Sequence, residues 1–309
     1  MDTHPSISVI VSTYHREDSL MDCLVSVLAQ DYAGQMEIIV VDQTPTHSQG
    51  VLDFFTRNRR KITRIEHHEP NLPKARNTGA AAAQGELLIF VDDDMVLLPG
   101  ALERFAEQVL PGSRRAVAGL PVSVAAPEDS LNDYARLYGK RIRDANSGLI
   151  EHPFYIPAPF CIPAQLYGAL GGFDEDLGRL SPTAYGEDDE FWRRAARAGV
   201  RLFVDCGHRV VHRDHLAGGC GSRQTDPVLA LKYHMKSMAY IRIKQHGRLG
   251  TGGWLQLARG YIANREILRN RPGEVIRNFM TARKAVREVR AFMAGDRTVR
   301  SPAGGAYPA

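Results

Sequence analysis

The sequence lacks any long apolar run. Its 309 residues contain no stretch near the roughly 18 consecutive apolar residues that a membrane-spanning helix needs. Residues 1–15 also lack a basic segment followed by an apolar one, which is the pattern of a secretion signal. We therefore expect a cytoplasmic protein.

Cysteine is scarce and scattered. The four cysteines are Cys23, Cys161, Cys206 and Cys220, and no two of them have the CxxC spacing of a redox or zinc motif. Their density is also far below that of a disulfide-stapled domain. We interpret all four as free thiols.

The chain has little excess charge of either sign, but its charges are unevenly distributed. The formal net charge is only +4, yet carboxylates cluster before Glu190 and arginines are frequent after Thr251. Hydrophobic residues make up 44% of the chain and charged residues 24%, which is typical of a soluble α/β domain with an appendage. The sequence has no internal repeat.

Apolar runs that stop at polar residues alternate with helical patterns in the N-terminal half. The strands are expected at residues 7–14, 36–44, 62–67, 86–94 and 116–124. The intervening helices are expected at residues 17–30, 72–84 and 99–109. This alternation predicts an α/β fold with a doubly wound, mostly parallel sheet.

The second half of the chain is less regular. The proline-containing segment 125–160 has no firm period and predicts a specificity insert. Helices are expected at 164–170 and 188–198, and short strands at 200–204 and 209–212. Three further helices are expected at 227–246, 253–269 and 272–293.

These patterns predict the domain organisation. Residues 1–222 are expected to form an α/β domain with two halves, at 1–124 and 125–222. Residues 223–294 form a helical extension, and the polar, glycine-containing end at 295–309 is expected to be disordered.

Polar side chains end three of the expected strands. Thr13 and Tyr14 end the first, Asp42 the second, and Asp92 to Asp94 the fourth. Ligands of open α/β sheets collect beyond the carboxyl ends of strands. Three adjacent carboxylates repel one another, and a hard cation such as Mg²⁺ or Mn²⁺ would relieve this while binding a diphosphate. A solvated acidic loop is the alternative.

In an extended segment the side chains alternate between the two faces. We therefore expect Asp92 and Asp94 to point the same way and Asp93 to point to the other side.

Five segments, taken in order, resemble one known family. They are SVIVSTYHRED, EIIVVDQT, ARNTGAAAAQGELLIFVDDDM, GGFDEDLG and GEDDEFWRRAARAG. Together they are similar to the family 2 glycosyltransferases with the GT-A fold, over residues 6–215. The resemblance implies inverting transfer of a sugar from a nucleotide diphosphate donor, with UDP expected, to an acceptor hydroxyl. Such enzymes build polysaccharides or glycoconjugates.

The resemblance implies that residues 1–222 are the catalytic domain, with the nucleotide-binding half at 1–124 and the acceptor-binding half at 125–222. It also assigns a donor site residue by residue. The position of Asp42 reads the nucleotide base, and Thr13 and Tyr14 lie against the base or ribose. The donor-binding set also includes Arg76, Asn77, Asp92 and Asp93, while Asp94 and His212 are the implied ligands of Mn²⁺ or Mg²⁺. Each has a plainer alternative, such as a turn-capping aspartate, a helix-surface arginine or a structural histidine.

The same resemblance assigns the acceptor side. Asp188 is the implied general base and Glu187 the implied contact to an acceptor hydroxyl. Carboxylates at a helix start also oppose the helix dipole, and this is the structural alternative for the group. Gly172, Phe173 and Asp174 match a turn that borders the sugar pocket. Trp192 either stacks on the acceptor or fills the core, and the core is favoured.

The expected C-terminal helices have a basic amphipathic pattern outside the resemblance. It is compatible with peripheral contact to an anionic membrane at its inner face, with packing on the catalytic domain, or with a homodimer. We favour packing. The expected partners are a nucleotide-sugar donor and a glycan, lipid-linked or small-molecule acceptor, without nucleic acid.

Two other functions compete with glycosyl transfer. A sugar nucleotidyltransferase also has an α/β sheet and metal-binding aspartates, but it needs a glycine-rich, basic loop after the first strand. The segment STYHRED is not such a loop. A non-catalytic nucleotide-sugar-binding module would not need the carboxylates assigned to the metal and to the base.

Overall fold

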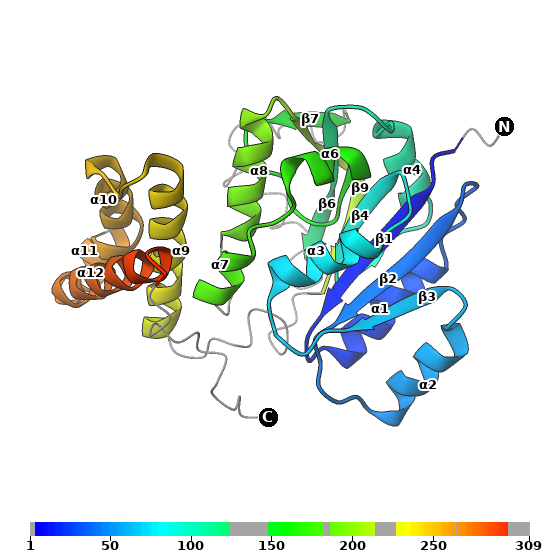
Figure 1. Cartoon of the computed structure of the whole chain (residues 1–309), viewed down its shortest axis with the longest axis horizontal. Helices are drawn as coiled ribbons and strands as arrows, with labels where there is room; N and C mark the ends of the chain where they lie inside the picture. Colours follow the sequence, from blue (N-terminus) through cyan, green and yellow to red (C-terminus); the bar gives the residue numbers. More distant parts are fainter. Residues whose placement is uncertain (1–3, 124–147, 182–185, 214–226, 264, 296–309) are drawn as a thin grey trace.

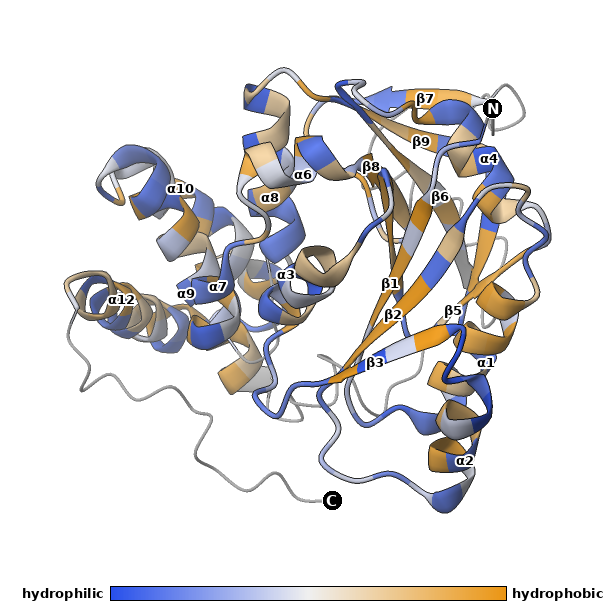
Figure 2. Ribbon diagram, turned by 45° about the vertical axis from the view of Figure 1, so that its right-hand side comes forward, coloured by the Kyte–Doolittle hydropathy of each residue, from blue (hydrophilic) through white to orange (hydrophobic). Residues whose placement is uncertain are grey.

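The computed structural model describes residues 4–123, 148–181, 186–213, 227–263 and 265–295. A nine-stranded sheet crosses the molecule in the order β3-β2-β1-β4-β8-β6-β9-β5, with β7 paired to β9 (Figure 1). Helices cover both faces: α3, α6, α7 and α8 lie on one side and α1, α2 and α4 on the other (Figure 2).

The N-terminal half of the sheet is parallel. Its strands are β1 (Ile7–Thr13), β2 (Met36–Asp42), β3 (Ile62–Glu66) and β4 (Leu87–Asp92). In the register, Thr13 pairs with Asp42 and Ser12 with Asp92. The carboxyl ends of these strands therefore meet at one edge of the sheet. Every residue of β1 is buried, as expected for a strand covered on both faces (Figure 2).

The other half of the sheet is mixed. Its strands are β5 (Met95–Leu97), β6 (Arg115–Ser123), β7 (Leu149–His152), β8 (Phe160–Pro163) and β9 (Arg201–His212). β8 is antiparallel to β4 and β6, whereas β6 and β9 are parallel. β5 and β7 are antiparallel to β9, so six of the nine strands share one direction. The prediction of a mostly parallel α/β sheet is confirmed.

The prediction of two short strands near the end of the catalytic domain was wrong. β9 is a single strand, and a register shift against β6 between Gly119 and Leu120 absorbs the irregular segment. A bulge leaves extra residues without a ladder position and bends the strand, so in the sequence it resembles a break.

The helices of the catalytic domain connect these strands. They are α1 (Glu17–Leu28), α2 (Gln49–Asn58), α3 (Leu72–Ala82), α4 (Ala101–Gln108), α6 (Ala164–Leu170), α7 (Glu175–Leu180) and α8 (Glu187–Arg197). The sequence pattern missed α2 and α7. Only two residues of α2 are buried, and α7 has six residues, so neither presents a long apolar stripe.

The C-terminal helices form a second core beside α7. They are α9 (Pro227–His246), α10 (Thr251–Leu257), the π-helical segment η3 (Ala258–Ile262), α11 (Arg265–Asn270) and α12 (Glu274–Met293). Leu177 and Leu180 of α7 join Met235, Ile241 and Val289 in this core. The favoured alternative, packing of the extension on the catalytic domain, is thus confirmed for one side of these helices (Figure 1).

Several expectations fall wholly or partly outside the described residues. These include most of the insert 125–160, the domain boundary at 222, Cys220 and the tail 296–309. Cys23, Cys161 and Cys206 are buried free thiols, as expected. Among the described helices, none combines the length and the apolar character that crossing a bilayer requires.

Gly79 sets the distance between α3 and the sheet. A Cβ atom at this position would lie 2.5 Å from Cγ2 of Ile10 and 3.3 Å from Cγ2 of Val41, both in buried strands. Only glycine therefore allows α3 to pack this closely on β1 and β2.

We predict that Gly79→Ala destabilises the protein. Overpacking a close-packed core costs about 1–3 kcal/mol. The matched control is Gly252→Ala in α10, where a Cβ meets nothing within 4 Å and the helix gains alanine's propensity. Thermal unfolding should show Gly79→Ala melting below Gly252→Ala by several degrees. Equal midpoints would contradict the close packing.

Candidate active site

The candidate site lies where the parallel strands end and α8 begins. Thr13 ends β1, Asp42 ends β2 and Asp92 ends β4, while Glu187 and Asp188 open α8. The register of the strands brings the first three positions to one edge of the sheet. The sequence prediction that these polar residues converge is confirmed for the strand ends.

Arg76 joins the two halves of the site. It lies in α3, is 3% exposed, and donates to Asp92 Oδ1 at 2.9 Å and to Asp188 Oδ1 at 2.7 Å. Its guanidinium carbon lies 5.0 Å from the centroid of the Phe173 ring. Burial opposes its charge, but Asp188 and Asp92 outweigh burial and raise the pKa of Arg76. It is a permanently charged bridge and not a helix-surface arginine.

Arg16, which the sequence reasoning did not single out, binds the other two aspartates. Its Nη1 lies 3.0 Å from Asp93 Oδ1 and 2.6 Å from Asp94 Oδ2. Thr13 Oγ1 donates to Asp93 Oδ2 at 2.7 Å. Burial, opposed by Arg16, raises the pKa of Asp93 to about 7. Thr13 and Asp93 are both buried, so they stabilise the site from its interior side.

The expected alternation of Asp92, Asp93 and Asp94 was wrong. β4 ends at Asp92, and the next two residues form a turn into β5. The turn aims Asp93 and Asp94 at the same guanidinium, while Asp92 faces Arg76. The alternation rule applies only to extended backbone, and the chain leaves that conformation here.

Asp94 and His212 can hold a divalent cation. Asp94 Oδ1 lies 3.5 Å from His212 Nε2, because Met95 of β5 pairs with His212 of β9. Two ligand atoms that each lie about 2.1 Å from a metal ion, with a right angle at the metal, are about 3 Å apart. The separation between Asp94 and His212 is close to this value. Burial raises the pKa of Asp94, but His212 and Arg16 bring it below its usual value, so the carboxylate is ionised.

The protein alone supplies few ligands here. No group of three or more metal-binding side chains occurs among the described residues. Mg²⁺ and similar cations are commonly bound by one or two protein groups together with substrate phosphates. The pair formed by Asp94 and His212 fits a cation that a diphosphate completes.

Glu187 and Asp188 begin α8 after Gly186, whose φ of 93° places it in the left-handed region. Burial is the main cause that raises the pKa of both carboxyl groups, and Arg76 opposes it. The Asp188 side chain is 21% exposed, so it faces both Arg76 and the open side of the site. A carboxylate with a raised pKa is a stronger base than an ordinary aspartate.

Asp42 does not offer its carboxylate to a base in this structure. Its side chain is fully buried and accepts from Thr44 N at 2.9 Å, His47 Nε2 at 2.7 Å and Arg64 Nε at 2.8 Å. The interpretation as a direct base reader is therefore corrected. Asp42 instead positions Arg64 and His47 at the end of β2, and the neighbouring Tyr14 is itself buried.

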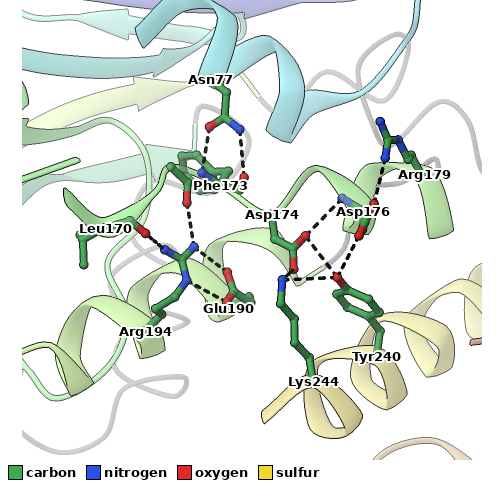
Figure 3. A network of polar contacts seen from close by, with 11 residues as sticks. Asn77, Leu170, Phe173, Asp174, Asp176, Arg179, Glu190, Arg194, Tyr240 and Lys244 are labelled. Carbon is green, nitrogen blue, oxygen red and sulfur yellow. Dashed lines mark hydrogen bonds and ion pairs between the residues drawn. The ribbon is translucent and has the colours of Figure 1, made fainter. Parts of the chain in front are cut away.

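Asn77 holds the turn at Gly171 to Asp174. Its side-chain oxygen accepts from Phe173 N at 2.8 Å, and its nitrogen donates to Phe173 O at 2.9 Å (Figure 3). The same oxygen also accepts from Tyr167 Oη at 2.7 Å. A Cβ on Gly172, which has φ of 67°, would lie 2.6 Å from Asn77 Oδ1. Asn77 thus shapes the turn, and its position near the nucleotide stays a prediction of the resemblance.

Asp174 connects this turn to the C-terminal helices. Its carboxylate caps α7 and lies 2.6 Å from Lys244 Nζ and 3.3 Å from Tyr240 Oη, both on α9 (Figure 3). Only 7% of the Asp174 side chain is exposed. The Asp174 carboxylate thus holds α9, and the expectation that its turn borders the sugar pocket stays a prediction.

Phe173 and Trp192 belong to the core. Phe173 is 3% exposed and stacks on Phe191 with ring centroids 4.4 Å apart. Trp192 has no exposed surface and packs edge to face against Phe160 at 4.7 Å. Stacking of Trp192 on an acceptor is therefore ruled out in this conformation, and Phe173 acts through the Arg76 contact.

The sequence held partial signals for the residues that were missed. Arg16 follows β1 by three residues, in a loop that must face the crevice. Arg64 is a charged residue within the short strand β3, which calls for a partner. Lys244 gave no such signal, because its partner Asp174 lies 70 residues away in the chain.

The family model for glycosyl transferase family 2 matches residues 8–167 of the chain. This segment is more than half of the 309 residues. The chain belongs to glycosyl transferase family 2. The match contains Arg16, Asp42, Arg76 and the three aspartates, whereas Asp188 and His212 lie beyond it.

Two curated relatives of this family 2 member are larger proteins. The chain is 25% identical over 262 residues to the O-antigen biosynthesis protein RfbC of Myxococcus xanthus, covering 76% of this chain and 19% of that protein. It is 32% identical over 217 residues to an N-acetylglucosaminyltransferase of Mesorhizobium japonicum, covering 64% of this chain and 49% of that one. The chain thus spans about a fifth to a half of these relatives.

Solved structures share the fold of this glycosyltransferase. A structure of S. aureus TarS in complex with UDP-GlcNAc has a TM-score of 0.61 at 17% identity, covering 95% of this chain and 89% of that one. A mannosyltransferase from Pyrobaculum calidifontis in complex with GDP-Man and Mn²⁺ has a TM-score of 0.57 at 17% identity, covering 96% and 77%. The fold is GT-A, as the resemblance implied.

We predict that Glu187→Gln stabilises this glycosyltransferase at neutral pH. Because the folded state raises the pKa of Glu187, ionising it costs stability, and the cost builds up as pH rises above the pKa of the unfolded chain. Glutamine removes this cost, so the unfolding midpoint should rise by about 2–4 °C at neutral pH.

The gain should shrink in acid, below both pKa values of Glu187, where the wild-type carboxyl is also neutral. The control is Glu66→Gln, whose side chain is 58% exposed and should change the midpoint little. A gain that is the same at all pH values would refute the role of burial.

Proposed function

We propose that the protein is an inverting, metal-assisted glycosyltransferase with Asp188 as its general base. The observation that carries this proposal is the Arg76 bridge. It ties Asp92, at the strand end where donors bind in α/β sheets, to Asp188 at the start of α8. The bridge places a donor-side carboxylate and a candidate base on either side of one guanidinium, as transfer between two bound substrates requires.

The donor is a nucleoside diphosphate sugar, and we propose UDP as its nucleotide. The solved relative TarS contains UDP-GlcNAc. Because Asp42 is buried under Arg64 and His47, the nucleotide base contacts the protein surface at the end of β2 and does not contact the Asp42 carboxylate. Asp92, whose side chain is 34% exposed, is the strand-end aspartate that lies open to the ribose.

Asp94 and His212 would hold a divalent cation, Mn²⁺ or Mg²⁺. Such a cation supplies stabilisation of the negative charge that grows on the leaving diphosphate. The mannosyltransferase with the same fold contains Mn²⁺. In this chain, Arg16 holds Asp94 from the opposite side and keeps its second oxygen aimed at His212.

Asp188 takes the proton of the acceptor hydroxyl as that oxygen attacks the anomeric carbon. One base is sufficient for a single displacement, which inverts the anomeric centre. Arg76 orients Asp188 through a 2.7 Å bond and limits the rise of its pKa. Glu187, which is 9% exposed, accepts a hydrogen bond from another acceptor hydroxyl. The acceptor is a carbohydrate or another hydroxyl compound used in glycoconjugate synthesis.

Different substitutions should impair donor binding and sugar transfer. We predict that UDP binds with Mn²⁺ and loses at least about tenfold in affinity in Asp94→Ala, since a metal ligand is removed. Asp188→Asn should bind UDP normally and lose about 10²–10⁴-fold in transfer or donor hydrolysis. Calorimetry and UDP release measure the two.

The control is Asp189→Asn, the neighbouring α8 carboxylate that pairs with Arg193 at 2.7 Å. It should behave as wild type in both assays. Tighter binding of UTP than UDP would favour a nucleotidyltransferase, and metal-dependent binding without turnover would favour a binding module. Equal loss of UDP binding in Asp94→Ala and Asp188→Asn would refute the assigned roles.

The pH profile should report the raised pKa of Asp188. A base works only when deprotonated, and burial raises the pKa of this group. We therefore predict that the transfer rate falls on the acidic side with a midpoint above the value of about 3.9 for a free aspartate. Asp94 stays ionised there, because its pKa is lowered.

Initial rates of UDP release at saturating donor, between about pH 4 and pH 9, measure this profile. Asp188→Asn should lose the acidic limb along with most of the activity. A limb that persists unchanged in Asp188→Asn would assign the base to another residue.

A further inference from the structure

The last helix, α12, has two sides of opposite character. Ala282, Ala285, Val286 and Val289 are buried in the second core, where α12 packs on α9. The opposite side is exposed, and we call it the outer face of α12. It consists of Ile276, Arg277, Phe279, Met280, Arg283, Lys284, Arg287 and Arg290.

The outer face contains only apolar and cationic side chains. At 3.6 residues per turn, its members span an arc of about 160°. Five are cations and three are large apolar residues. The two carboxylates of α12 lie outside the arc. Glu274 is half-buried and pairs with Arg277 at 3.0 Å, and Glu288 is bound by Lys232 at 2.8 Å and Lys236 at 2.6 Å.

The apolar residues are strongly exposed. Ile276 is 77% exposed, Met280 57% and Phe279 44%. The Trp254 ring of α10 lies 6.2 Å from the Phe279 ring, and the adjacent Leu255 is 50% exposed. A face that only meets water normally mixes both signs of charge and carries few large apolar residues. The outer face therefore fits a partner with apolar and anionic parts.

We propose that the outer face of α12 binds an anionic lipid membrane surface, with the helix lying in the plane of the headgroups. A helix in this position buries its apolar residues at the acyl boundary and pairs its cations with anionic headgroups. The arc of about 160° supplies both on one side, and α9 anchors the helix to the enzyme from the other.

Two other partners fit the charges less well. A nucleic acid would pair with the cations but leave Ile276 and Met280 in water. A two-fold dimer across the outer face would set five cations of one copy against the same five of the other, and only Arg277 has a carboxylate of α12 beside it to offset its charge. The proposal does not depend on the catalytic roles assigned above.

Vesicle co-sedimentation of the full chain tests the proposal. We expect binding to vesicles of equal phosphatidylglycerol and phosphatidylcholine, weakening as salt rises, and little binding to pure phosphatidylcholine. Arg283→Glu combined with Arg287→Glu should weaken binding about tenfold or more. Ile276→Ser combined with Met280→Ser should weaken it about tenfold.

Matched controls change similar residues elsewhere. Arg59→Glu with Arg60→Glu removes exposed cations after α2, and Val25→Ser with Leu110→Ser removes side chains that are 54% and 62% exposed. Both should bind as wild type, and thermal unfolding should show that every variant is folded. Equal binding to neutral vesicles, or equal loss in the controls, would overturn the proposal.

Two further results would replace the membrane with another partner. One is a dimer in light scattering that Ile276→Ser with Met280→Ser dissociates. The other is binding of a DNA oligonucleotide that needs the two arginines but not the two apolar residues. UDP binding, measured in the same variants, should be unchanged, so failure of this proposal is distinguishable from failure of the catalytic one.

Discussion

A buried guanidinium is the constraint on which the site depends. Arg76 is 3% exposed and carries its charge because Asp92 and Asp188 both bind it. Without it, carboxylates from two separate elements would face each other in a poorly solvated space, where like charges repel strongly. The Phe173 ring packs against the guanidinium from one side. A core residue thus helps to position Arg76 and, through it, both carboxylates.

The sequence predicted most of the fold and the location of the site, because both depend on local patterns. Buried strands such as β1 and β4 are continuous apolar runs, and their polar ends mark the crevice. The direction of individual side chains was less predictable. The turn after Asp92 redirected Asp93 and Asp94 toward Arg16, and no periodicity in three identical residues could show that.

Contacts between distant segments decide the roles that the sequence left open. Asp174, Asn77 and Trp192 are of residue types that serve equally well in a substrate pocket or in a framework. Asp174 became a framework residue only because Lys244, 70 positions later, reaches it. Asp42 likewise has the sequence position of a ligand-binding group, but in the structure its carboxylate accepts hydrogen bonds from His47 and Arg64. A motif gives the position of such a residue, and its partners decide its role.

The contacts that hold the C-terminal helices also connect them to the candidate active site. Asp174 binds α9 on one side of the turn, and Asn77, the residue after Arg76, binds the backbone of Phe173 on the other. Lys244 of α9 and the guanidinium of Arg76 are therefore joined through this turn by short polar contacts and one aromatic ring. The same guanidinium holds Asp188, the proposed base, and the position of a base matters because group transfer tolerates little error in geometry.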